Sequence, residues 1–212
     1  MILSHAAGLK EILSDKLNQF GLTAEEVDED KPLIQQIRDA DVLVNGLGKV
    51  DKSTIDVCPK LRLVHQVGTG IDNVDVDYCK LKSIYVANVP HLNNVAVAEH
   101  TLFLMIYLSK NIKSAGEGLM KRRVINVLGS ELYEKRLTII GLGATGIEVA
   151  KRAKCFGMNI TAITRHPDIK KLKEIDNNGY NNKMNFFVSK ILGVEDLLDS
   201  LIDADYISIH TY

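Results

Sequence analysis

Three glycines between residues 141 and 146 form the motif with the clearest chemical meaning in this sequence. Gly141, Gly143 and Gly146 have the spacing Gly-x-Gly-x-x-Gly, between an apolar strand-like run, 137–140, and a helical run, 147–156. In such a turn the first glycine permits a tight bend, the second lets the backbone approach a diphosphate, and the third lets helix and strand pack closely. The N–H groups at the start of the helix then point at the phosphates. The motif in this setting predicts a dinucleotide-binding site.

The end of the next predicted strand bears on which dinucleotide binds. In many such folds an acidic residue about 20 positions after the glycines holds the adenosine ribose. Here Thr164 and Arg165 lie 18 and 19 residues after Gly146, and neither is acidic. Because an arginine can pair with a 2′-phosphate that a carboxylate would repel, the pattern favours NADP over NAD. Two alternatives stay open: Arg165 is only a solvated charge at a strand end, or Asp168 reaches the ribose of NAD.

Strand and helix patterns alternate through the chain, and these elements must position the groups above. Short apolar runs predict strands at 41–45, 61–67, 84–87, 137–140, 158–163 and 206–210. A long, largely buried helix is predicted over 94–113, where apolar residues occupy most faces. Residues 176–185 are rich in asparagine and predict a solvated loop. The alternation predicts an α/β protein with doubly wound parallel sheets, in two units, residues 1–93 and 94–212.

Composition and charge argue against several classes of function. Lys and Arg number 26 against 27 Asp and Glu, a net charge of −1, so no nucleic-acid partner is expected. The longest apolar run, 102–108, is too short for a membrane span, which takes about 20 residues. The start of the chain lacks the pattern of a signal peptide. The three cysteines are widely spaced, which fits a reducing cytoplasm and predicts neither disulfides nor a metal site.

Five motifs occur in an order that resembles one enzyme family. They are VGTGIDNVD at 67–75, VANVPHLNNVAVAEH at 86–100, LGSELYEKRL at 128–137, GLGATG at 141–146 and DADYISIHT at 203–211. Over residues 41–212 the chain resembles the D-isomer-specific 2-hydroxyacid dehydrogenases, above all members similar to phosphoglycerate dehydrogenase and glyoxylate/hydroxypyruvate reductase. The resemblance implies a flavodoxin-like substrate domain, residues 1–93, and a truncated Rossmann dinucleotide-binding domain, residues 94–212. It further implies hydride transfer between NAD or NADP and a small 2-keto or D-2-hydroxy acid, and a homodimer for a full-length form.

The resemblance also assigns a substrate loop. Val67, Gly68 and Thr69 match the turn whose backbone N–H groups hold the substrate carboxylate, and Thr69 would also lie near the nicotinamide. A glycine-bounded turn can aim consecutive N–H groups at an anion, so this role is physically reasonable. Gln66 stands where some members carry an arginine that faces the substrate. This departure favours a small acid over a phosphorylated one.

Further cofactor contacts follow from the same resemblance. The backbone of Ala144 and Thr145 would reach the diphosphate, although many members have an arginine at the first of these positions. His210 and Thr211 would lie on the adenosine side of the cofactor. His100, at the start of the long helix, is interpreted as structural.

The chemistry of the family needs three groups that these 212 residues do not include. In the family an arginine binds the substrate carboxylate, a histidine donates a proton, and a glutamate raises the pKa of that histidine; all three follow the last strand found here. We therefore assign no catalytic residue and expect the 212 residues alone to be inactive. We also expect the strand at 137–140 to lack its fourth-strand neighbour, leaving an apolar edge. The alternative function is a non-catalytic module that binds NAD(P) as a sensor or scaffold.

Overall fold

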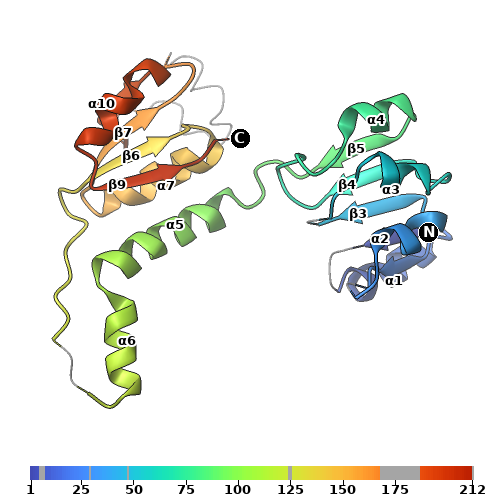
Figure 1. Ribbon diagram of the computed structural model, residues 1–212, viewed down its shortest axis with the longest axis horizontal. Helices are drawn as coiled ribbons and strands as arrows, with labels where there is room; N and C mark the ends of the chain where they lie inside the picture. The colour runs from blue at the N-terminus through green and yellow to red at the C-terminus, as the bar shows by residue number, and fades with distance from the viewer. Residues whose placement is uncertain (5–7, 29, 47, 124–125, 168–186, 212) are drawn as a thin grey trace. The chain divides into compact units, whose positions relative to one another are not determined.

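The chain forms two units, Met1–Leu92 and Asn93–Tyr212, each described here by itself. The computed structural model describes residues 1–4, 8–28, 30–46, 48–123, 126–167 and 187–211 (Figure 1). The asparagine-rich segment predicted at 176–185 lies outside them. Among the described helices, none is long and apolar enough to span a lipid bilayer.

The first unit is built on five parallel strands. They are β1 (Ile2–Ser4), β2 (Ala24–Glu26), β3 (Val42–Asn45), β4 (Leu63–Gln66) and β5 (Tyr85–Asn88), in the order β2-β1-β3-β4-β5. This is the order of a flavodoxin-like sheet, which confirms the predicted fold class. The polar β2 was not predicted, because three residues with one buried side chain carry no period-2 signal.

Short helices connect these strands. They are α1 (Leu9–Asn18), α2 (Leu33–Gln36), η1 (Ile37–Asp39), α3 (Lys52–Asp56) and α4 (Val76–Leu81). Asp51 caps α3 by accepting hydrogen bonds from the N–H groups of Ser53 and Thr54. The Ser53 hydroxyl also donates to this carboxylate, and its bond, followed by that from the Thr54 N–H, lowers the pKa of Asp51 to about 2. Asp75 caps α4 through the N–H of Tyr78. These caps fix where each helix begins, and so fix the loops that follow β3 and β4.

The second unit is built on four parallel strands. They are β6 (Arg136–Ile140), β7 (Asn159–Ile163), β8 (Lys190–Leu192) and β9 (Tyr206–Ile209), in the order β8-β7-β6-β9. The expectation that β6 lacks a fourth-strand neighbour is wrong. The last strand, β9, pairs with β6 on the side opposite β7. The chain also contains β8, which pairs with β7 and is the third strand of this sheet along the chain, so β9 is the fourth. The four strands therefore have the order 3-2-1-4 of a Rossmann sheet. Within the described residues β9, not β6, is the strand at that edge.

The helices of this unit are α5 (Asn94–Ser109), α6 (Ile112–Met120), α7 (Ala144–Cys155), η2 (Val194–Asp196) and α10 (Leu197–Ile202). Helix α6 follows α5 and extends away from the sheet (Figure 1). Helices α5 and α7 pack with β6 and β7 in one apolar core, while α10 lies on the other side of the strands (Figure 1). The Thr138 hydroxyl on β6 donates to the Ser200 carbonyl of α10 at 3.0 Å, which ties α10 to the sheet.

The predicted long helix over 94–113 is two helices. Asn111 adopts a left-handed conformation, φ 50°, which ends the first helix and starts the second. The prediction that the first helix is largely buried is also wrong, because only a stripe of α5 faces the core, namely Ala98, Leu102, Met105 and Ser109. His100 lies on an exposed part of α5 beside Phe103, with ring centroids 5.9 Å apart, and is not a core residue.

Candidate functional site: a glycine turn and an amide-supported loop

Two of the three glycines are required by the packing of the second unit. Gly141 follows β6 with φ +99°, and a Cβ added there would overlap the carbonyl oxygen of His210. A Cβ added at Gly146 would overlap the carbonyl oxygen of Gly141. The turn is therefore held tightly between β9 and the first turn of α7, so these two positions accept no side chain without a backbone shift.

Gly143 differs from the other two glycines. A Cβ added there would meet no atom within 4 Å, and its φ of −86° is open to any residue. The fold itself therefore does not require a glycine at this position. A ligand that approaches the backbone closely needs a residue without a side chain, and this need would explain a glycine at position 143.

The start of α7 offers hydrogen-bond donors beside Gly143. The first bond of the helix runs from the N–H of Ile147 to the Gly143 carbonyl at 2.9 Å. The preceding N–H groups of Ala144 and Thr145 therefore have no acceptor in the helix, and the helix dipole favours an anion there. The Thr145 hydroxyl lies 3.0 Å from Asn94 Oδ1, which joins the start of α7 to the start of α5.

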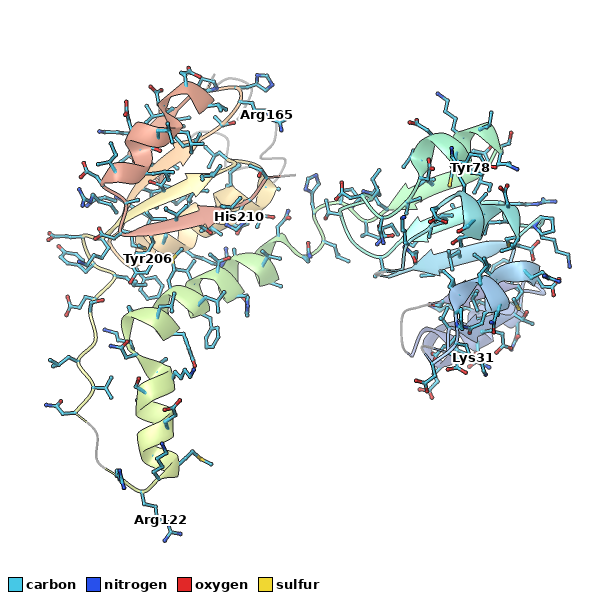
Figure 2. All side chains as sticks on the ribbon, viewed as in Figure 1. Lys31, Tyr78, Arg122, Arg165, Tyr206 and His210 are labelled. Atoms are coloured by element: carbon cyan, nitrogen blue, oxygen red, sulfur yellow. The ribbon has the colours of Figure 1, made fainter. Side chains whose placement is uncertain are left out.

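The ends of three parallel strands bring the other predicted cofactor residues to the same edge of the sheet. Thr164 follows β7 and donates its N–H to the Leu192 carbonyl at 3.1 Å, while Arg165 is exposed. Arg165 and His210 both lie near the carboxyl ends of their strands (Figure 2). Asp168, the alternative partner for the ribose, lies outside the described residues.

His210 is a half-buried residue next to the glycine turn. Its Nε2 lies 2.8 Å from the Ser208 hydroxyl, and burial lowers the pKa of its imidazole. The ring is therefore neutral at pH 7 and places no positive charge beside the turn. The exposed Thr211 follows, with its methyl group close to Gly141.

In the first unit, the loop after β4 rests on side-chain amides. Gln66 is 5% exposed; its Oε1 accepts from Asn45 Nδ2 at 2.8 Å, and its Nε2 donates to the Gly46 carbonyl at 2.6 Å. The Gln66 amide is therefore used inside the unit. Asn45 Nδ2 also donates to the Gly48 carbonyl at 2.8 Å, while Asn45 Oδ1 is buried with no donor among the described residues.

The residues after Gln66 are more exposed. The Val67 side chain is 49% exposed, and Gly68 has φ +138°, a conformation that favours glycine. Thr69 accepts a hydrogen bond from Asn88 Nδ2 through its carbonyl oxygen at 2.7 Å. Sequence reasoning treated Asn88 only as the end of a strand and assigned no role to Asn45 or Asn94, because amide contacts between distant segments leave no spacing pattern.

One cavity of the second unit lies away from the glycine turn. A cavity of about 470 Å³ lies between α10 and the start of the strands, with Arg136, Asn159 and Lys190 in its lining. These residues mark the amino ends of β6, β7 and β8. Ligands of open parallel sheets bind at the carboxyl ends, so we place the candidate site at the glycine turn and not in this cavity.

Comparison with known proteins gives the family. Residues 2–173 match the profile described as "D-isomer specific 2-hydroxyacid dehydrogenase, catalytic domain". The chain belongs to this family. The match covers most of the chain and confirms the resemblance inferred from the motifs.

Individual relatives of this family member are longer than it is. It is 38% identical over 201 residues to the D-3-phosphoglycerate dehydrogenase of Methanocaldococcus jannaschii, covering 90% of this chain and 33% of the relative. It is 34% identical over 143 residues to the glyoxylate reductase of Pyrococcus furiosus, covering 63% and 43%. The D-lactate dehydrogenase of Aquifex aeolicus, solved with NAD and lactic acid, has the same fold, with a TM-score of 0.77, 24% identity and coverage of 99% and 60%. The chain thus spans less than two thirds of each.

Proposed function

We propose that this chain supplies the dinucleotide-binding turn and the substrate-carboxylate loop of an NAD(P)-dependent D-2-hydroxyacid dehydrogenase. The observation that carries the proposal is the contrast at the glycine turn: Gly141 and Gly146 are packed against backbone, whereas Gly143 faces open space beside a helix N-terminus. The bound nicotinamide would supply the hydride donor or acceptor. The reaction is hydride transfer between that cofactor and a small 2-keto or D-2-hydroxy acid.

The residues of the chain have distinct roles in this proposal. The N–H groups of Ala144 and Thr145 hold the diphosphate, and Thr164, Arg165, His210 and Thr211 line the adenosine side. The loop Val67-Gly68-Thr69 holds the substrate carboxylate through backbone N–H groups. Gln66 supports this loop and adds no positive charge to it, which favours a small acid without a phosphate group.

The test is binding followed by turnover on the 212-residue polypeptide. We expect NADPH or NADH to bind saturably, as measured by nucleotide fluorescence. We expect no reduction of glyoxylate or hydroxypyruvate, because the proposal assigns no proton-transfer residue to these 212 residues. Absence of binding of either nucleotide would contradict the proposed cofactor site, and measurable reduction would contradict the proposed inactivity. No contact among the described residues favours the sensor or scaffold role over this one.

Arg165 is the residue that we propose selects NADP. The substitution Arg165→Ala is expected to weaken NADPH binding about tenfold, since a charge-assisted hydrogen bond is worth about 1.5–3 kcal/mol and Arg165 is exposed. NADH binding should change less than about twofold, because NADH has no 2′-phosphate for the lost charge to contact. Fluorescence titration with both nucleotides measures the ratio of the NADPH and NADH dissociation constants in each variant.

A matched control for this substitution is Arg122→Ala. Arg122 is also exposed but lies beyond the end of α6, far from the glycine turn (Figure 2). It should leave both affinities unchanged. Equal loss of NADPH and NADH affinity in Arg165→Ala would show that Arg165 does not discriminate between them.

We also propose that a full-length form is a homodimer. Helix α5 exposes a row of large apolar side chains, with Phe103 51%, Leu104 45% and Leu108 65% exposed. Apolar area of this kind on one helix is typical of a surface that another chain covers. Sedimentation velocity on the full-length protein would test the dimer.

The three cysteines support a reducing compartment, and we propose the cytoplasm. All three are free, with Cys58 and Cys79 buried and Cys155 exposed. Burial raises the pKa of the Cys58 and Cys79 thiols, so both stay protonated and inert.

A further inference from the structure

The loop after β4 presents a run of backbone N–H groups without acceptors. The N–H of Val67 donates to the Asn45 carbonyl at 2.8 Å and is the last that continues the sheet pattern. Within the described part of the chain, the next three N–H groups, those of Gly68, Thr69 and Gly70, have no acceptor. Consecutive free N–H groups in a turn can form a concave anion site.

The direction of two of these N–H groups is set by the carbonyls that precede them. The Gly68 carbonyl accepts from the Val89 N–H at 2.9 Å, and the Thr69 carbonyl accepts from Asn88 Nδ2 at 2.7 Å. In a trans peptide the C=O and the following N–H point in opposite directions, and the chain has no cis peptide. Both carbonyls face the end of β5, so the N–H groups of Thr69 and Gly70 both point away from it, on the same side.

The two bonds differ in what they depend on. The bond from Val89 is donated by the backbone and survives any change of side chain. The bond from Asn88 is donated by a side-chain amide, so the orientation of the peptide between Thr69 and Gly70 depends on residue 88.

We propose that Asn88 is the positioning residue of the carboxylate loop, acting on the direction of the Gly70 N–H beside that of Thr69. This inference rests on the proposed function, which assigns the loop to the substrate carboxylate. Asn88 does not touch the acid; it holds the Thr69–Gly70 peptide so that the second donor faces the same way as the first. The Thr69 hydroxyl also donates to the Val89 carbonyl at 3.4 Å, so Thr69 itself stays near β5. Without Asn88 the Thr69 carbonyl loses its side-chain donor, and the direction of the Gly70 N–H is no longer fixed.

The chain offers a control with the same chemistry in the same loop, at Asn73. Asn73 Nδ2 donates to the Gly48 carbonyl at 2.8 Å, but Asn45 Nδ2 donates to that carbonyl too. Asn73→Ala therefore removes an amide donor from the same edge of the sheet without leaving the Gly48 carbonyl unpaired. It should disturb the Thr69–Gly70 peptide far less than Asn88→Ala.

The experiment follows the backbone amide signals of Thr69 and Gly70 by NMR. The 212-residue chain, saturated with NADPH, is titrated with sodium glyoxylate against sodium chloride at matched ionic strength. In the unsubstituted chain we expect both signals to shift saturably. In Asn88→Ala we expect the Gly70 shift to disappear, the Thr69 shift to remain, and glyoxylate affinity to fall about tenfold, the value of one charged hydrogen bond. Asn73→Ala should stay within about twofold.

The outcomes separate this inference from the proposed function. Unchanged affinity together with a normal Gly70 shift in Asn88→Ala would overturn the role of Asn88 alone. An equal loss in Asn73→Ala would also overturn it, since the effect would then be general loosening of the loops. No shift at either residue in the unsubstituted chain would overturn the carboxylate site itself. Asn88→Ser, whose hydroxyl is about one bond shorter than the amide, replaces the alanine variant if that variant does not fold.

Discussion

Gly146→Ala is expected to destabilise the second unit by about 2 kcal/mol, although alanine is the better helix former. Replacing a helical glycine by alanine gains up to about 1 kcal/mol in helix propensity. Here the added Cβ would overlap the Gly141 carbonyl oxygen, and neither atom belongs to a flexible side chain. Overpacking of this kind costs about 1–3 kcal/mol and occasionally more. The steric cost is therefore larger than the propensity gain, and α7 must move away from β6.

Urea unfolding followed by circular dichroism measures this effect, with Gly116→Ala as the control. Gly116 lies within α6, and a Cβ there would meet no atom within 4 Å. Gly116→Ala should keep or raise stability, because only the propensity gain applies. If Gly146→Ala were as stable as Gly116→Ala, the close contact of α7 with the glycine turn would be wrong.

Gly143→Ala should have the opposite profile, with nearly normal stability and poor nucleotide binding. Its Cβ would meet no protein atom, so the free energy of unfolding should change by less than about 1 kcal/mol, the usual scale for a change at a helix N-cap. The same methyl group would stand where the diphosphate approaches the backbone. A steric cost of about 1–3 kcal/mol corresponds to about 5- to 150-fold weaker NADPH binding.

Fluorescence titration combined with thermal unfolding distinguishes the two glycines. Gly143→Ala should separate binding from stability, whereas Gly146→Ala should lose both together. Normal NADPH affinity in Gly143→Ala would place the diphosphate elsewhere and would contradict the proposed cofactor site.

Some strands of the second unit follow from the local sequence pattern, whereas their pairing depends on tertiary contacts. The apolar runs at 137–140 and 158–163 led to β6 and β7 within one residue at each end, because buried parallel strands are continuous apolar segments. Strand β8 was missed, since the three residues Lys-Ile-Leu carry too little pattern. Missing β8 led to the wrong neighbour for β6, because β9 was then counted as the third strand of the sheet and not the fourth.

The helix predicted over 94–113 shows a limit of hydrophobic periodicity, which does not reveal which faces of a helix are covered. Apolar residues surround it, so periodicity alone predicted burial on most faces. The structure buries one stripe, because α7 and the sheet cover only that side within the second unit. The break at Asn111 depends on one left-handed residue, and asparagine adopts that conformation without requiring it.

The family, the α/β class and the glycine turn follow from the sequence alone, because these depend on residue types at fixed spacing along the chain. The three-dimensional structure was needed to show which glycine is free of packing, where β9 pairs, and which side chain donates to the loop after β4. Gly143 is distinguished from Gly141 by contacts that Gly141 makes with the distant residues His210 and Thr211. Asn88 meets Thr69 only because β4 and β5 are neighbours in the sheet. Contacts of this kind depend on the three-dimensional arrangement of the chain, so no spacing within the sequence can reveal them.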